Sequence, residues 1–132
     1  EEKDVTTEVL KNLFKSAFIK VLDIDDVSFD VHIDVLDSKI MIDDERKNIR
    51  FSIFFPIDDK PYEESIFKSN EYNSTHILIR YFVEKYQDTT YWVADYTMSY
   101  EMGVIPFQVV NNARIFNRFV TDTAREFLNS KQ

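Results

Sequence analysis

The spacing of the apolar residues changes along this chain, and that change constrains the fold more than any other feature. Near the N-terminus, after a plausible helix cap at Asp4, apolar residues recur every three or four positions from Val9 to Leu22. This spacing predicts a helix over about residues 5–21, because positions three and four apart share one helical face. The same spacing returns after a proline and predicts a final helix over residues 106–128.

Between these two segments the apolar residues mostly alternate with polar ones, which is typical of half-buried strands. Such alternation predicts five strands, over residues 27–33, 39–43, 49–55, 77–83 and 92–100. A short helix is predicted over residues 62–71, between the third and fourth strands. The element order α-β-β-β-α-β-β-α, with mostly short connections, predicts an α+β fold. In it a five-stranded antiparallel sheet carries the N- and C-terminal helices on one face.

The composition fits a single domain over residues 1–132 and narrows the chemistry available to it. Hydrophobic residues make up 44% of the chain, which is enough for a core that needs no disulfide or structural metal. The chain has no cysteine and only one glycine, which excludes thiol chemistry, glycine-rich phosphate loops and nucleophile elbows. We therefore predict no catalytic residues and no cofactor, and a non-enzymatic domain is favoured over an enzyme.

Two acidic segments contain residues that could bind a metal ion. The run at 23–26 resembles the start of a calcium loop, but Ser28 and Asp34 occupy the positions that need glycine and glutamate. Asp30, His32 and Asp34 lie two residues apart and share one strand face, where a divalent ion would find suitable ligands. Alternation alone already predicts them as the solvent face of a strand, so we predict no metal site.

The net charge of −8 lies entirely in the first half of the chain, since residues 67–132 are neutral overall. An acidic surface repels phosphate backbones and anionic lipid, so neither a nucleic acid nor a membrane is expected as a partner. No apolar run approaches the roughly 18 residues that span a bilayer. The first residue is Glu1 and not methionine, so a leader could have been removed, and the sequence does not determine the cellular compartment. A cytoplasmic location is favoured, and an exported form with a removed leader is the alternative.

Large apolar side chains are predicted on both faces of the sheet. If the alternating residues of the third, fourth and fifth strands face the helices, several apolar residues must point the other way, within a polar surround. Contiguous apolar patches with polar rims often mark interfaces. We predict that a partner binds there, at Phe54, Leu78, Phe82, Tyr91 and Val93. The alternative is that the middle helix or a terminus of the same chain covers this patch.

A second hypothesis places a small ligand between the curved sheet and the C-terminal helix. Such a pocket needs a few polar groups in an apolar setting. Tyr81, Asp95, Tyr96 and Arg114 are the side chains that we would expect to line it. This alternative would make the domain a ligand-binding or enzymatic one.

Three segments of the chain resemble the YbjN family of proposed bacterial sensory-transduction regulators. Residues 69–73, Ser-Asn-Glu-Tyr-Asn, and the following strand at 77–80 resemble the turn that ends the middle helix in that family. The Asp-rich turn at 23–26 and the apolar last helix at 106–128 are also similar. The resemblance covers nearly the whole chain and implies a fold shared with type III secretion chaperones. It further implies a non-enzymatic regulatory or chaperone-like domain, which binds a protein partner or a second copy of itself and carries over no catalytic residue.

Overall fold

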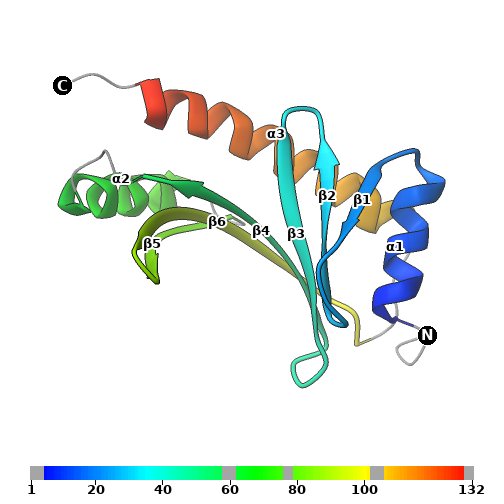
Figure 1. The fold of residues 1–132 in the computed structure, drawn as a ribbon. Coiled ribbons are helices and arrows are strands. Elements are labelled where there is room, and N and C mark those ends of the chain that lie inside the picture. Colours follow the sequence, from blue (N-terminus) through cyan, green and yellow to red (C-terminus); the bar gives the residue numbers. More distant parts are fainter. Residues whose placement is uncertain (1–4, 58–61, 76–78, 102–105, 130–132) are drawn as a thin grey trace.

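One antiparallel sheet of six strands and three helices make up the described residues, 5–57, 62–75, 79–101 and 106–129, of the computed structural model (Figure 1). The sheet order is β1-β2-β3-β4-β6-β5, and every pair of neighbouring strands is antiparallel. The helices are α1 (Thr7–Ser16), α2 (Tyr62–Thr75) and α3 (Pro106–Asn129). The strands are β1 (Lys20–Asp23), β2 (Ser28–Ile33), β3 (Leu36–Asp43), β4 (Asn48–Pro56), β5 (Arg80–Tyr86) and β6 (Thr89–Ser99). The predicted α+β fold with an antiparallel sheet is confirmed.

The predicted number of strands was wrong by one, because the first helix is shorter than its apolar spacing suggests. Helix α1 ends at Ser16, and the chain turns into β1, which pairs with β2. The turn is a Schellman motif: Phe18 N–H donates to the carbonyl of Lys15, and Ile19 N–H to that of Phe14, both at 3.0 Å. Phe18 takes the left-handed conformation, with φ 62°, at the position where glycine is usual.

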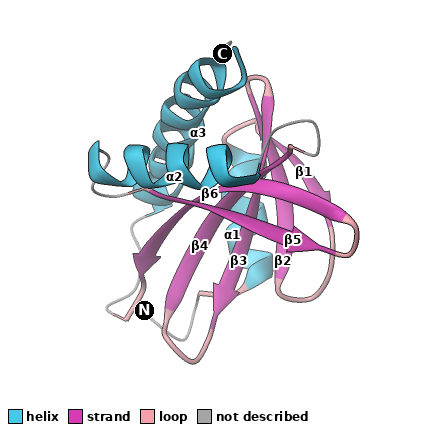
Figure 2. Cartoon of the chain, turned by 90° about the vertical axis from the view of Figure 1, so that its left-hand side faces the viewer, coloured by secondary structure: helices cyan, strands magenta, loops and turns pink. Residues whose placement is uncertain are grey.

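The helix-facing side of the sheet forms the core, and α1 and α3 bury their apolar stripes against it. Figure 2 shows α1 behind the strands and α2 across the end of the sheet formed by β5 and β6. Phe14 of α1 meets Phe29 edge-on at 6.0 Å between ring centroids, and Phe116 of α3 lies 6.2 Å from Phe51. All four rings are almost completely buried, and each contributes roughly 1.5–3 kcal/mol of hydrophobic free energy.

Buried polar side chains tie the helices to particular strands. Asn117 of α3 is 1% exposed; it accepts a hydrogen bond from the Ser38 hydroxyl and donates to the Leu36 carbonyl at 3.2 Å. In α2, the Ser69 hydroxyl accepts from the indole N–H of Trp92 at 3.0 Å. Because Trp92 belongs to the core, α2 lies on the same side of the sheet as the other two helices. None of these described helices is both long and apolar enough to cross a membrane.

Candidate protein-interaction surface

The side of the sheet that points away from the helices, here called the outer face, carries an apolar cluster. Val93 of β6 lies at its centre, with Phe54 of β4 directly opposite on one side and Phe82 of β5 on the other. Val93 is completely buried, yet it is not part of the core cluster beneath the helices. The outer face therefore has a small hydrophobic centre of its own.

Three aromatic side chains surround Val93 and remain partly open to solvent. Phe54 is 39% exposed, while Phe82 and Tyr91 are half-buried. The rings of Phe54 and Tyr91 meet edge-to-face, with centroids 5.9 Å apart and an interplanar angle of 86°. We call Phe54, Phe82, Tyr91 and Val93 the outer-face cluster.

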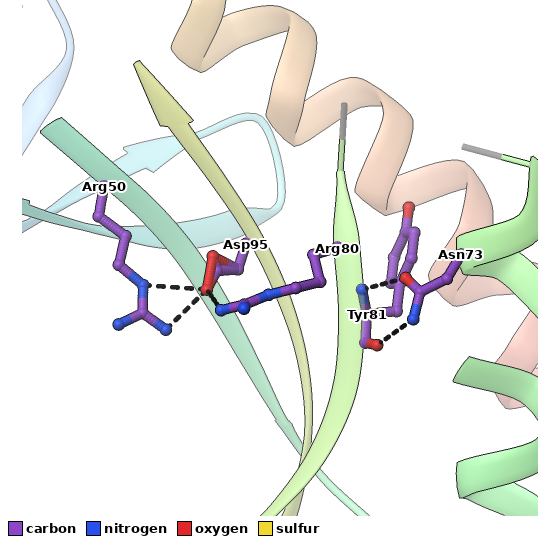
Figure 3. Close-up of polar contacts among 5 residues, drawn as sticks. All are labelled: Arg50, Asn73, Arg80, Tyr81 and Asp95. Carbon is purple, nitrogen blue, oxygen red and sulfur yellow. Dashed lines mark hydrogen bonds and ion pairs between the residues drawn. The ribbon is translucent and has the colours of Figure 1, made fainter. Parts of the chain in front are cut away.

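A buried carboxylate beside the cluster gathers two arginines. Asp95, two residues along β6 from Val93, is only 3% exposed. Its Oδ2 accepts hydrogen bonds from Arg50 Nε at 2.9 Å and Arg80 Nη2 at 2.8 Å, and lies 2.6 Å from Arg50 Nη2 (Figure 3). Two guanidinium groups share one carboxylate, so this part of the outer face keeps a local excess of positive charge.

The same arrangement fixes a cation on the aromatic cluster. The guanidinium carbon of Arg80 lies 4.9 Å from the ring centroid of Phe82, within the range of a cation–π interaction. Arg80 is held in place by Asp95 while most of its side chain remains exposed. The outer face thus combines exposed aromatic surface with positioned arginine side chains.

Four of the five predicted partner-binding residues share this surface, namely Phe54, Phe82, Tyr91 and Val93. The fifth, Leu78, lies outside the described residues. The sequence predicts a polar surround for the patch, but it does not predict that Arg50, Arg80 and Asp95 form one ion-paired group. That group depends on strands β4, β5 and β6 being neighbours, which no local pattern reveals.

The four residues of the predicted ligand pocket do not line one pocket. Tyr81 and Tyr96 lie on the helix-facing side, whereas Asp95 lies on the outer face. Burial raises the pKa of Tyr81, whose hydroxyl donates to Thr123 Oγ1 at 3.3 Å. Arg114 is exposed on α3 and donates to the Ala17 carbonyl at 3.4 Å. Strand alternation directs the Asp95 side chain to the opposite face of the sheet from Tyr96, so the structure does not bring these four side chains together.

A groove of about 500 Å³ runs between α2 and the outer edge of β5. Asn73 of α2 closes one end of this edge, since its side-chain amide both donates to and accepts from the backbone of Tyr81 (Figure 3). Ile66 and Asn70 of α2 line the helix side, and Phe82 and Val83 are among the residues of the strand side. The groove therefore adjoins the outer-face cluster at Phe82.

Metal-binding groups are not gathered among the side chains that the structure describes, where no cluster of three or more His, Asp or Glu is present. His32 pairs with Asp37 at 2.6 Å between Nδ1 and Oδ1. In the Asp-rich turn, the Asp25 carboxylate accepts hydrogen bonds from the backbone N–H of Val27 and from the N–H and hydroxyl of Ser28. This carboxylate therefore serves to hold the turn that leads into β2.

Comparison with known proteins shows that the fold is shared with a solved structure. No protein-family model and no curated protein sequence matches the chain. The chain is similar to the crystal structure of YbjN from E. coli, a protein described as a candidate transcription regulator, with a TM-score of 0.80. The match covers 92% of this chain and 90% of that one at 15% sequence identity. The chain thus has the YbjN fold, as its sequence resemblance implied.

Proposed function

We propose that this domain binds a protein partner through its outer face, as a regulatory or chaperone-like module without catalytic activity. The observation that carries the proposal is the outer-face cluster, an aromatic surface on the side of the sheet that the helices leave uncovered. The solvent side of an antiparallel sheet is ordinarily polar. An apolar cluster on that side, with a completely buried valine at its centre, is therefore unusual and calls for a functional explanation. A docking surface supplies one.

The composition of the cluster supports this function. Phe54, Phe82 and Tyr91 offer aromatic contact area, and Arg50 and Arg80 stand beside them in fixed positions. Aromatic residues and arginine are enriched at the centres of protein interfaces, where they account for most of the binding free energy. Because Asp95 already holds both arginines, little side-chain entropy would be lost when a partner binds them.

Charge favours protein as the kind of partner. The net charge of −8 disfavours a DNA or RNA backbone, whose binding depends on positive charge. A regulatory role of the kind named for YbjN would therefore be exercised by this chain through protein contact. The two arginines next to the cluster suit a partner surface that places a carboxylate beside an apolar side chain.

The test is a Phe54→Asp variant used as bait in a quantitative pull-down from native lysate. Phe54 is the best position because it is substantially exposed, so the introduced charge lies at the surface. We expect at least a tenfold loss of affinity for the recovered protein, as is typical of an aromatic hot spot. The matched control is Phe107→Asp on α3, a phenylalanine that is 73% exposed.

Sedimentation velocity of the purified chain, run alongside, identifies a second copy as the partner if Phe54→Asp dissociates a dimer. Equal affinity of the wild type and of a folded Phe54→Asp variant for every recovered partner would contradict the proposal. It would then follow that the cluster serves the stability of the sheet alone.

A further inference from the structure

At the edge of the sheet, alternate residues of β5 direct their backbone N–H and C=O groups away from β6. Among the strands that the structure describes, β5 lies at the end of the sheet and pairs with β6 alone. The N–H and C=O of Tyr81 both point away from β6, because Asn73 binds them from the other side. In an antiparallel strand, residues two apart direct their backbone groups the same way. The N–H and C=O of Val83 and Lys85 therefore also point outward from the sheet.

These outward groups differ in whether they have a partner. Tyr81 is bound by the Asn73 amide, which presents one donor and one acceptor at 2.7 and 2.6 Å, as the backbone of a neighbouring strand would. Among the residues that the structure describes, no group occupies the corresponding positions at Val83 and Lys85. Asn73 thus takes the place of a neighbouring strand at Tyr81. At Val83 and Lys85 the described residues leave the edge of β5 open.

The groove between α2 and β5 lies along this edge. It has about 500 Å³ of space and is lined on the helix side by Ile66, which is 36% exposed, and Asn70. Val83 forms part of its strand side. The space is therefore bordered by a row of backbone donors and acceptors on one side and by an apolar side chain on the other.

We propose that this edge holds an extended segment of another polypeptide, which adds a strand to β5 by pairing with the backbone of Val83 and Lys85. The inference deepens the proposed protein-binding function by naming how a partner's chain is engaged. An open strand edge beside a groove is the arrangement that accepts an added strand, in which main-chain hydrogen bonds give affinity and side-chain contacts give specificity.

A second copy of β5 is a poor occupant for this edge. Antiparallel self-pairing centred on Val83 would set Lys85 of one copy against Tyr81 of the other, whose outward groups Asn73 already occupies. Centring the pair on Glu84 or on Lys85 would instead place like charges directly opposite each other, which destabilises a sheet. Charged residues at an edge commonly prevent such pairing between copies.

The side chains along the edge indicate the chemistry of the segment. Val83 is half-buried and points toward the helix side, so the residue opposite it should be apolar and pack against Ile66. Glu84 is exposed and points the other way, so the neighbouring residue of the segment should be basic.

The experiment selects short random peptides from a displayed library against the full chain. We expect the enriched peptides to share an apolar residue next to a lysine or arginine. In NMR spectra of the complex with a synthetic copy of the best peptide, the amide protons of Val83 and Lys85 should exchange at least tenfold more slowly than in the free protein.

Two variants at one position separate backbone pairing from side-chain contact. Lys85→Pro removes an outward N–H without removing a bond to β6, so the edge strand should tolerate it, and peptide affinity should fall about tenfold. Lys85→Ala keeps the N–H and should bind within about threefold of the wild type. If Lys85→Pro does not fold, the amide exchange of the wild-type complex decides instead.

Three outcomes overturn the inference and are distinguishable from failure of the proposed function. If the peptides bind while the amides of Val83 and Lys85 stay unprotected, or if Phe54→Asp abolishes their binding, the peptide lies on the outer face and not at the edge. If no peptide is enriched, the edge does not take short extended segments. The outer-face proposal is then still tested by the pull-down with Phe54→Asp.

Discussion

Asn73 and Tyr81 are joined by two hydrogen bonds, one from the Tyr81 N–H to the Asn73 side-chain oxygen at 2.6 Å and one from Asn73 Nδ2 to the Tyr81 carbonyl at 2.7 Å. The side chain of one helix residue thus does for β5 what a neighbouring strand would do. It also anchors the end of α2 to the sheet beside the stacked pair of Tyr81 and Trp92, whose ring centroids are 5.2 Å apart.

Asn73→Ala should lower the free energy of unfolding by about 1–2 kcal/mol, because two hydrogen bonds to a partly buried backbone are lost at once. Urea unfolding followed by circular dichroism measures this change. The control is Asn70→Ala, which alters an exposed asparagine one helical turn earlier and should change stability by less than about 0.5 kcal/mol. Equal effects of the two substitutions would show that the pair with Tyr81 contributes nothing to stability.

The shared carboxylate predicts unequal roles for its two arginines. Asp95→Ala should cost about 2 kcal/mol, because a buried acceptor of charged hydrogen bonds is removed. Arg50→Ala should cost more than Arg80→Ala, since Arg50 reaches Asp95 through two nitrogens and is the less exposed of the two. For Arg80→Ala, largely open to water, we expect roughly 0–1 kcal/mol. Urea unfolding of the three variants checks this order, and a larger loss for Arg80→Ala than for Arg50→Ala would contradict it.

Phe18 is a position where a substitution should stabilise the protein. It is 98% exposed and holds a left-handed backbone conformation, which costs a non-glycine residue roughly 1–2 kcal/mol. Phe18→Gly removes that cost and loses no packing, while the extra freedom of glycine in the unfolded chain takes back part of the gain. We expect a net increase of up to about 1 kcal/mol in urea unfolding.

Arg118→Gly, at an exposed position inside α3, is the control for Phe18→Gly and should lower stability by about 1 kcal/mol. If Phe18→Gly destabilises the protein by a similar amount, the side chain of Phe18 has a structural role that its exposure does not suggest.

Stability should fall in acid partly through the turn before β2. The backbone N–H of Val27, followed by the hydroxyl of Ser28, holds the pKa of Asp25 below its usual value. A carboxyl whose pKa is depressed by folding stabilises the folded state above its unfolded pKa, about 3.9, and loses that contribution as the pH falls through the folded value. Asp25→Asn should therefore flatten the loss of stability below about pH 4, measured by urea unfolding at a series of pH values.

Asp30 provides the opposite case for the same measurement. Burial, followed by the nearby charge of Asp37, raises the pKa of Asp30, so its ionised form is disfavoured in the folded state. Protonation of Asp30 therefore adds stability as the pH falls through its raised pKa toward its unfolded value. Asp30→Asn should increase stability at neutral pH, in contrast to Asp25→Asn. A decrease would mean that the Asp30 carboxylate makes a favourable contact in solution.

Much of the fold can be predicted from local patterns, because the different spacings of apolar residues in helices and strands are visible along the sequence. The alternation of Phe51 and Ile53 in β4 and of Trp92 and Ala94 in β6 corresponds to side chains buried beneath the helices. The same alternation placed Phe54 and Phe82 on the other side, which is how the outer-face cluster was anticipated from sequence. A period of two assigns each residue to one face without any knowledge of its neighbours.

The tertiary structure decided what depends on contact between distant segments. Val21 fits a helical stripe as well as it fits a strand, and only its pairing with Val31 of β2 makes it part of β1. The ion-paired group at Asp95 forms because β4 and the β5–β6 hairpin, which α2 separates in sequence, become neighbours in the sheet. Asn73 meets Tyr81 because α2 folds back along the edge of the sheet. Periodicity along a chain determines which face a side chain takes, whereas which segments lie side by side is settled by the free energy of packing the whole core.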